Sequence, residues 1–271
     1  MAAAAAASKA KGGRIECYVD VASFFSYIAF VQLASIEDTL RQHGVEVDVY
    51  PVLIGGINAG SGNKPPWVVP AKAKYLTAHD TRRANLLAGL DPVRTQGPKD
   101  LFKAARTMAA NRALSYISRT FPREVYRAAM LGLFAKFWTV DAAARDPEED
   151  QARRDLTTPD KVAAALADIP APTGDGEKKL FTAEQIAQIS AAAESGEYKA
   201  LLKKRTEEAL GRGAFGAPWF WVTPAASSDG TAAVSGEPVF GSDRWHVIFD
   251  ILGLPYTKLA LQGTDPAKSK L

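Results

Sequence analysis

The chain has 271 residues, of which 47% are hydrophobic and 23% are charged, a composition typical of ordinary globular proteins. The formal net charge of +3 is small, and basic residues are spread among acidic ones instead of gathering in one stripe, which argues against a nucleic-acid-binding protein. No stretch approaches the roughly 20 apolar residues of a membrane helix, so we expect no membrane insertion. The single cysteine, Cys17, excludes an internal disulfide and favours neither zinc ligation nor dithiol chemistry, so we expect no metal.

Both ends of the chain are predicted to be tails. Residues 1–13 contain an alanine run without a basic segment before it, which is a poor secretory signal. Residues 258–271 form a polar tail that ends in Ser269-Lys270-Leu271, a tripeptide that acts as a peroxisomal address when it is free and exposed. The sequence therefore predicts recognition by the peroxisomal import receptor, with the cytoplasm or the mitochondrion as alternative locations and a chance ending as the other interpretation.

The first third of the chain predicts a strand, a helix and a second strand. Residues 15–19 alternate apolar and polar side chains, and residues 26–43 repeat apolar side chains near helical spacing until Gly44. Residues 45–53 again alternate with a period of two. The reactive turn of such a unit would lie between the first strand and the helix.

Helical stretches fill residues 70–212, separated by proline-containing breaks at 91–92, 97–98, 121–122, 146–147 and 170–172. Thr158 precedes a proline at a favoured first helical position, and Thr182 with Gln185 predicts a capping box. Strands are predicted again at residues 218–223 and 237–241, and a last helix at 243–252, before Gly253. This order predicts an α/β thioredoxin fold with a large inserted all-helical domain. Its thioredoxin-like domain would combine residues 14–69 and 213–257, and its helical domain residues 70–212.

The first turn of the first helix is where a thioredoxin fold carries its reactive group, because free N–H groups and the helix dipole favour an anion there. Redox members of the fold place Cys-x-x-Cys at this turn, whereas this chain has Ser23-Phe-Phe-Ser26, which excludes a dithiol mechanism. The alternative is a thiol that is brought by a substrate and has an ordinary pKa of about 8.5. A hydrogen bond from a serine hydroxyl, together with the helix N-terminus, could lower this pKa by roughly one to three units. The other interpretation is that Ser23 or Ser26 only caps the helix.

Four motifs together give a more specific indication. Asp20-Val-x-Ser23-x-x-Ser26 is followed by residues 61–66 (SGNKPP), 213–218 (GAFGAP) and 240–244 (FGSDR). In this order the set resembles the kappa class of glutathione transferases, over residues 14–254. The related 2-hydroxychromene-2-carboxylate isomerases share the framework, but residues 61–66 look more like the transferase.

The resemblance implies a glutathione site made from both halves of the fold. Ser23 corresponds to the catalytic serine that hydrogen-bonds the glutathione sulfur. Phe24 and Phe25 stand where the family usually has a proline and an aromatic residue. The remaining implied glutathione contacts are Asn63, Lys72, Ala217, Pro218, Ser242 and Asp243.

Each of these contacts has a local reason or a plainer alternative. Pro218 is expected to be cis, which would let Ala217 pair with the cysteinyl backbone. Lys72 would meet the glycine carboxylate of the peptide, or is simply a solvated helix residue. Ser242 and Asp243 are expected to open the last helix and to bind the γ-glutamyl end, or to act only as caps.

The function implied is transfer of glutathione to hydrophobic electrophiles, with reduction of organic peroxides as a further activity, by a homodimer. The electrophile would lie between the helical domain and the first helix, where Trp67 and Trp138 are candidates for lining it, although such aromatic residues more often belong to the core. Two alternatives remain: a glutathione-dependent isomerase of the chromene-carboxylate type, and a protein that binds glutathione or hydrophobic ligands without turnover.

Overall fold

The computed structural model describes residues 12–172, 178–226 and 235–257. The proposed targeting tripeptide Ser269-Lys270-Leu271 lies outside the described residues, as does most of the expected N-terminal tail. The first strand begins at Gly13, the last residue of the expected N-terminal tail.

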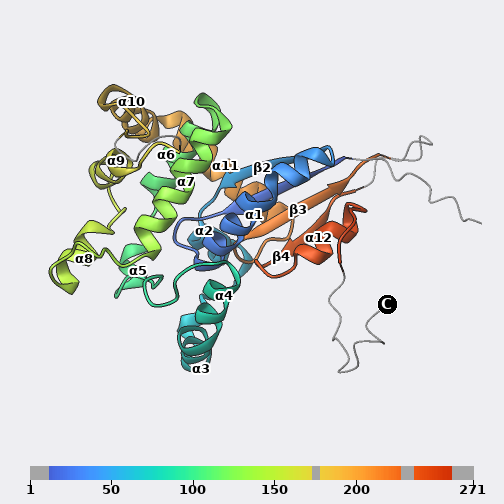
Figure 1. Cartoon of the computed structure of the whole chain (residues 1–271), viewed down its shortest axis with the longest axis horizontal. Helices are drawn as coiled ribbons and strands as arrows, with labels where there is room; N and C mark the ends of the chain where they lie inside the picture. Colours follow the sequence, from blue (N-terminus) through green and yellow to red (C-terminus); the bar gives the residue numbers. More distant parts are fainter. Residues whose placement is uncertain (1–11, 173–177, 227–234, 258–271) are drawn as a thin grey trace, which may run out of the picture.

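A four-stranded sheet carries the fold. Its strands are β1 (Gly13–Val19), β2 (Val45–Pro51), β3 (Trp219–Pro224) and β4 (Glu237–Phe240), in the order β2-β1-β3-β4. β1 is parallel to β2 and antiparallel to β3, and β4 is antiparallel to β3. β1 and β3 are far apart in the sequence but are neighbours in the centre of the sheet (Figure 1).

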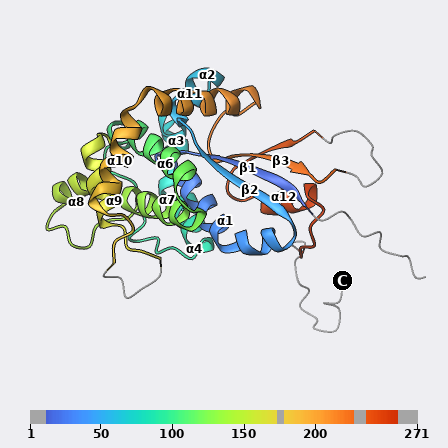
Figure 2. The same cartoon turned by 90° about the horizontal axis from the view of Figure 1, so that it is seen from above.

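Helices cover both faces of this sheet (Figure 2). Helices α1 (Phe24–Gln42) and α12 (Trp245–Ile251) lie on one face, and α2 (Ile54–Ser61) and α11 (Gly196–Gly211) on the other. The alternation in β1 matches this arrangement, because Ile15, Cys17 and Val19 join the core beneath α1 while Tyr18 joins the smaller core beneath α11. The predicted α/β thioredoxin fold is confirmed.

The remaining helices lie between β2 and β3 in the chain. They are the 3₁₀ helix η1 (Pro66–Val68), α3 (Pro70–Tyr75), the π-helical turn η2 (Leu76–Asp80), α4 (Thr81–Leu87), α5 (Leu101–Ala104), α6 (Met108–Thr120), α7 (Arg123–Trp138), α8 (Pro147–Arg153), α9 (Pro159–Asp168) and α10 (Ala183–Glu194). α7 packs on α1, where the rings of Tyr27 and Phe134 stack with centroids 5.4 Å apart. One apolar core runs from the sheet through α1 into α6, α7, α9 and α10. The division into two domains therefore stays a prediction.

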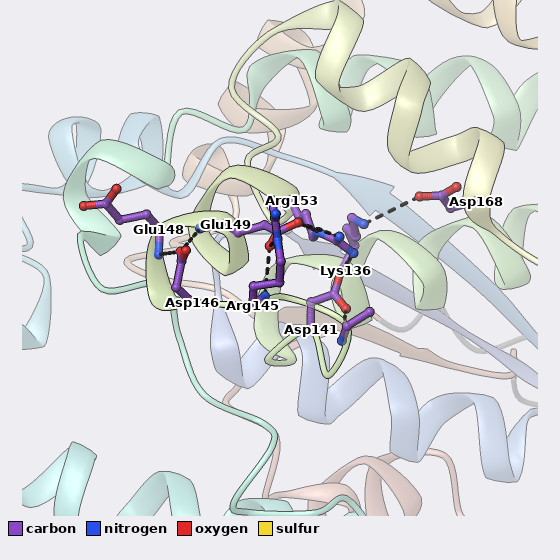
Figure 3. Close-up of polar contacts among 9 residues, drawn as sticks. Lys136, Asp141, Arg145, Asp146, Glu148, Glu149, Arg153 and Asp168 are labelled. Carbon is purple, nitrogen blue, oxygen red and sulfur yellow. Dashed lines mark hydrogen bonds and ion pairs between the residues drawn. The ribbon is translucent and has the colours of Figure 1, made fainter.

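Local signals set several helix starts as expected. Thr182 and Gln185 form the predicted capping box of α10, and α9 begins at Pro159 after Thr158. At α8, the Asp146 carboxylate accepts from the N–H groups of Glu148 and Glu149 (Figure 3). In the described part of the chain, no helix is both long enough and apolar enough to cross a membrane.

Helix α2 was not predicted from the sequence. It contains three glycines in eight residues, a composition with poor helix propensity. Its glycines permit close packing on α11, since a Cβ on Gly60 would lie 2.6 Å from Leu210 Cδ1 and one on Gly56 would lie 3.1 Å from Thr206 Cγ2. Tertiary packing thus stabilises a helix that local propensity disfavours. The second strand accordingly ends at Pro51, two residues earlier than expected.

Candidate functional site

Ser23 lies at the turn between β1 and α1 and is almost fully buried, with 5% of its surface exposed. Its backbone is extended, and its hydroxyl oxygen accepts a hydrogen bond of 3.2 Å from the N–H of Ser26, so it is the N-cap of α1. The N–H groups of Phe24 and Phe25 find no acceptor among the described residues. The first turn of α1 holds no acidic residue. The first turn of α1 therefore combines a serine hydroxyl with free N–H groups and no negative charge, an arrangement that suits an anion.

The Ser23 hydroxyl also reaches the far end of the chain. It donates a hydrogen bond of 2.8 Å to the carbonyl oxygen of Ala217, and the Ala217-Pro218 peptide bond is cis. The cis proline was predicted from the sequence, and this prediction is confirmed. The serine and the segment that would pair with a peptide ligand thus touch each other directly.

Two more hydrogen bonds join the other motifs to this segment. The side-chain amide of Asn63 donates to the carbonyl oxygen of Phe215, 2.6 Å away. The N–H of Gly241 donates to the carbonyl oxygen of Pro218, 3.2 Å away. All four sequence motifs therefore meet around residues 213–218, although they come from four separate parts of the chain.

Asp20 is the residue of this site that sequence reasoning left without a role. Its buried carboxylate accepts from the Thr107 hydroxyl and the Asn111 amide, both at 2.7 Å, and from the N–H groups of Ala22 at 3.0 Å and Ile54 at 2.7 Å. Burial raises the pKa of Asp20, and these hydrogen bonds oppose that rise. The carboxylate joins the Ser23 turn to α2 and α6. The only sequence signal was its place at the head of the first motif.

The last helix differs from the prediction. α12 begins at Trp245 with Arg244 as its N-cap and has no side-chain cap, so Ser242 and Asp243 do not open it. Gly241 has φ +96°, and a Cβ placed on it would lie 3.0 Å from Asp243 Oδ1, so the Asp243 carboxylate folds back over this glycine. The alternative role expected for Ser242 and Asp243, capping of the last helix, is therefore wrong. Ser242 is buried and Asp243 is exposed.

Other expected site residues lie apart from this network of hydrogen bonds. Lys72 is exposed on α3. Phe24 is buried and meets Trp138 edge to face at 5.4 Å, while the Trp138 indole N–H donates to the carbonyl of Val21 at 2.8 Å. Trp138 is therefore a buried core residue, whereas Trp67 on η1 is 37% exposed to solvent.

Cys17 takes no part in this turn. It is fully buried in β1, and burial raises the pKa of its thiol, which keeps it in the unreactive protonated form. Any thiol chemistry at Ser23 needs a thiol from outside the protein.

Comparison with known proteins finds relatives that belong to one class of enzyme. Human glutathione S-transferase kappa 1 is 28% identical over 242 residues, covering 88% of this chain and 90% of that protein. The kappa 1 protein of Caenorhabditis elegans is 27% identical over 244 residues, covering 89% and 92%. These relatives confirm the resemblance to the kappa class.

The solved structure of a 2-hydroxychromene-2-carboxylate isomerase superposes with a TM-score of 0.60 at 17% identity, covering 89% of this chain and 94% of that one. At this identity the likeness concerns the fold. The family model of the DSBA-like thioredoxin domain matches residues 14–172, more than half of the chain. With its thioredoxin sheet, its Ser23 turn and its cis proline, the chain belongs to the DSBA-like thioredoxin family.

Proposed function

We propose that this protein is a glutathione transferase in which the Ser23 hydroxyl holds glutathione as its thiolate. The observation that carries the proposal is the position of Ser23, which caps α1 and contacts the carbonyl before the cis proline. The names of the curated relatives support the same activity. Serine at this turn supplies a hydrogen-bond donor for an external thiolate and no redox sulfur of its own.

The Ala217 carbonyl gives this proposal a defined binding step. The cysteinyl N–H of glutathione would donate to that carbonyl, as a short strand would, and compete there with the Ser23 hydroxyl. Rotation of the hydroxyl then directs its proton to the sulfur, where the free N–H groups of α1 add to the stabilisation of negative charge. Binding the peptide would in this way release the donor that activates it.

The other parts of glutathione would lie along the converging motifs. We assign Asn63, Phe24, Phe25 and Pro218 to the walls around the cysteinyl part. Lys72 would approach the glycine carboxylate, and Ser242 and Asp243 the γ-glutamyl carboxylate and ammonium groups. The exposed Asp243 carboxylate, relieved of any capping role, is free to accept from an ammonium group.

In the transfer reaction, the thiol proton leaves to solvent and the Ser23-bound sulfur attacks an electrophilic carbon. A carbon–sulfur bond forms while the leaving group departs with its electron pair. For an organic peroxide, one thiolate would displace the alcohol from the O–O bond, and a second glutathione would then give glutathione disulfide and water. We place the electrophile between α1 and the helical segment of residues 70–212, which we regard as an inserted domain.

The test is turnover with glutathione and 1-chloro-2,4-dinitrobenzene, with the conjugate and the remaining thiol both quantified. A transferase forms conjugate and consumes one glutathione for each product. An isomerase of the chromene-carboxylate type would convert its substrate without consuming glutathione. Calorimetric binding of glutathione without turnover across a broad panel of electrophiles and peroxides would instead indicate a binding protein and would contradict the proposal.

We also propose a homodimer. Nine of the eleven exposed large hydrophobic side chains among the described residues fall within residues 67–108. Such a concentration of apolar surface is typical of a protein–protein contact. Helices α3 and α4, which carry Tyr75, Leu86 and Leu87 of this set, project away from the sheet (Figure 1). We propose that this apolar surface of residues 67–108 packs against a second copy of the chain.

The proposed location is the peroxisome, from residues 269–271. A fluorescent protein fused at the N-terminus, which leaves these residues free, should collect in peroxisomes, and deletion of the three residues should release it. Diffuse fluorescence from the intact fusion would contradict this location.

A further inference from the structure

A cavity lies along β2, which is an edge strand of the sheet. It has a volume of about 530 Å³, a size typical of small-molecule sites. Its walls come from α1, β2, α6, α7 and α11, and none of the four motifs contributes to it. It is therefore separate from the proposed glutathione site.

The cavity is lined by five cationic side chains and two carboxylates, those of Glu37 and Asp48. The five cations are Arg119, Arg123, Arg127, Lys204 and Arg205. Asp48 is already paired with Arg14 at 2.7 Å, outside this set. The wall is thus strongly biased towards positive charge.

Glu37 does not neutralise the arginines around it. Its buried carboxylate is shared by Arg41 at 3.9 Å, Arg123, and Arg127 at 3.8 Å, so one negative charge faces three guanidinium groups. Lys204 forms no ion pair with any described residue. Arg119 and Arg205 are paired with Glu197 and Glu208, respectively. An excess of positive charge therefore remains at the cavity, which favours an anion.

The floor of the cavity is apolar, and two backbone carbonyls of β2 in its wall accept hydrogen bonds from side chains. Phe30, Leu33 and Val47 lie in the core, and Phe121 and Leu201 extend the apolar surface. The backbone carbonyl of Val47 accepts a hydrogen bond of 2.6 Å from the guanidinium group of Arg123. That of Val49 accepts from the Tyr126 hydroxyl at 2.9 Å.

Because these side chains already occupy the carbonyls of the edge strand, a peptide cannot extend the sheet there without displacing them. The Arg205 guanidinium is held 3.7 Å above the ring of Tyr50, so part of the cationic wall is ordered in advance. An apolar floor beneath a fixed cationic rim suits a small molecule with an apolar body and one acidic group.

We propose that this cavity is a binding site for an amphipathic organic anion, a carboxylate or sulfonate carried on an aromatic or aliphatic body. The apolar part lies against Phe30, Val47 and Phe121, and the acidic group meets Lys204 and Arg127. The site requires no glutathione and is independent of the transferase activity.

The test uses the fluorescent probe 8-anilinonaphthalene-1-sulfonate, with N-phenyl-1-naphthylamine as its analogue that lacks the sulfonate. The sulfonate should bind at least about tenfold more tightly, because only it satisfies the cationic wall. Saturation of the Ser23 site with S-methylglutathione, which has no free thiol, should leave this binding unchanged. Equal binding of the two probes, or displacement of the sulfonate by S-methylglutathione, would overturn the proposal.

A matched pair of variants locates the site. Lys204→Glu should weaken binding of the sulfonate by about tenfold. Lys203→Glu makes the same change of charge on the neighbouring residue of α11, which pairs with Glu207 and does not line the cavity, and it should have little effect. Both lysines are exposed, so both variants should fold. Ser118→Trp should also abolish binding by filling the cavity from α6. Equal affinities of the two lysine variants, or unaltered binding to Ser118→Trp, would contradict the assignment.

Discussion

The hydroxyl of Ser23 and the carbonyl oxygen of Ala217 are 2.8 Å apart, although 194 positions separate the two residues in the chain. The hydroxyl has one proton, so it cannot donate to this carbonyl and to a sulfur at the same time. The state of this hydrogen bond should therefore determine whether Ser23 can stabilise a thiolate.

Replacing Ser23 with alanine should raise the pKa of bound glutathione by about one to two units, because a charge-assisted hydrogen bond of roughly 1.5–3 kcal/mol is lost. Turnover should fall, while affinity for glutathione changes less. The ultraviolet absorbance of the thiolate, titrated with pH in the complex, measures the shift. Ser195→Ala is the control, since it removes the N-cap of α11 without touching the site. An unchanged thiol pKa in Ser23→Ala would remove Ser23 from its catalytic role.

Asp20→Asn should destabilise the protein by about 1–3 kcal/mol. The amide keeps one acceptor oxygen but turns an NH₂ group towards donors, either the Ile54 N–H or the group that includes Thr107 and Asn111. Urea unfolding followed by circular dichroism measures the loss. Asp38→Asn, on the exposed side of α1, should change stability by less than about 0.5 kcal/mol. Equal stabilities of the two variants would show that the Asp20 hydrogen bonds add nothing.

Asp243→Asn should weaken glutathione binding by roughly tenfold to a hundredfold, through loss of a charge-assisted contact with the γ-glutamyl ammonium group. Because Asp243 does not cap α12, the folded state should be little affected. Desamino-glutathione lacks the ammonium group, so it should bind the wild type poorly and lose little more in the variant. Calorimetry with both ligands decides the matter: if both weaken equally, Asp243 does not bind the amino group. Asp250→Asn, exposed on α12, is the control variant.

The pH dependence of α8 should follow Glu149. Hydrogen bonds from Arg145 and Arg153 lower the pKa of this carboxylate to about 2, from an ordinary 4.5. A lowered pKa in the folded state stabilises the protein above pH 4.5, and this contribution disappears as the pH falls from 4.5 towards 2. Carbon-13 NMR of the side-chain carboxyl should give a midpoint near the lower value.

The stability difference between wild type and Glu149→Gln should accordingly be largest at neutral pH and vanish near pH 2. Glu148→Gln, on the same helix, is the matched control, because Glu148 forms no ion pair among the described residues. A Glu149 midpoint at the ordinary value would show that the two arginines do not hold the carboxylate in solution.

The proposed dimer should depend on the apolar surface of α4. Leu86→Lys combined with Leu87→Lys places two charges on side chains that are 53% and 77% exposed, so the monomer should still fold. Light scattering coupled to gel filtration should show a dimer for the wild type and a monomer for this variant. Glu207→Lys on the exposed side of α11 should remain dimeric. A wild-type monomer would contradict the dimer proposal directly.

The sequence predicted those parts of the fold whose signals are local. Alternation placed β1, and Thr182 with Gln185 predicted a capping box, because each depends on neighbours a few positions away. α2 could not be predicted, since its glycines become favourable only where they meet Thr206 and Leu210. The prediction that the last helix starts at Asp243 was wrong for a related reason. The carboxylate that looked like a cap instead folds back over Gly241.

The candidate site shows the same limit. The motifs indicated which segments would carry chemistry, and the cis proline followed from the resemblance. The hydrogen bond that Asn63 donates to Phe215, and those that Asp20 accepts from Thr107 and Asn111, connect segments far apart in the chain. Their partners are set by the packing of α2 and α6 against the sheet, which no local pattern encodes.

The pairing of β1 with β3 also constrains how the chain can be synthesised. β1 ends at Val19, but β3 begins only at Trp219. At about 5–20 residues per second, a ribosome leaves that edge of β1 without its partner for on the order of ten seconds or more. The nascent chain during this time exposes an apolar strand edge, a known template for aggregation. Messages truncated before β3 should therefore yield chaperone-bound or insoluble chains instead of a smaller folded protein.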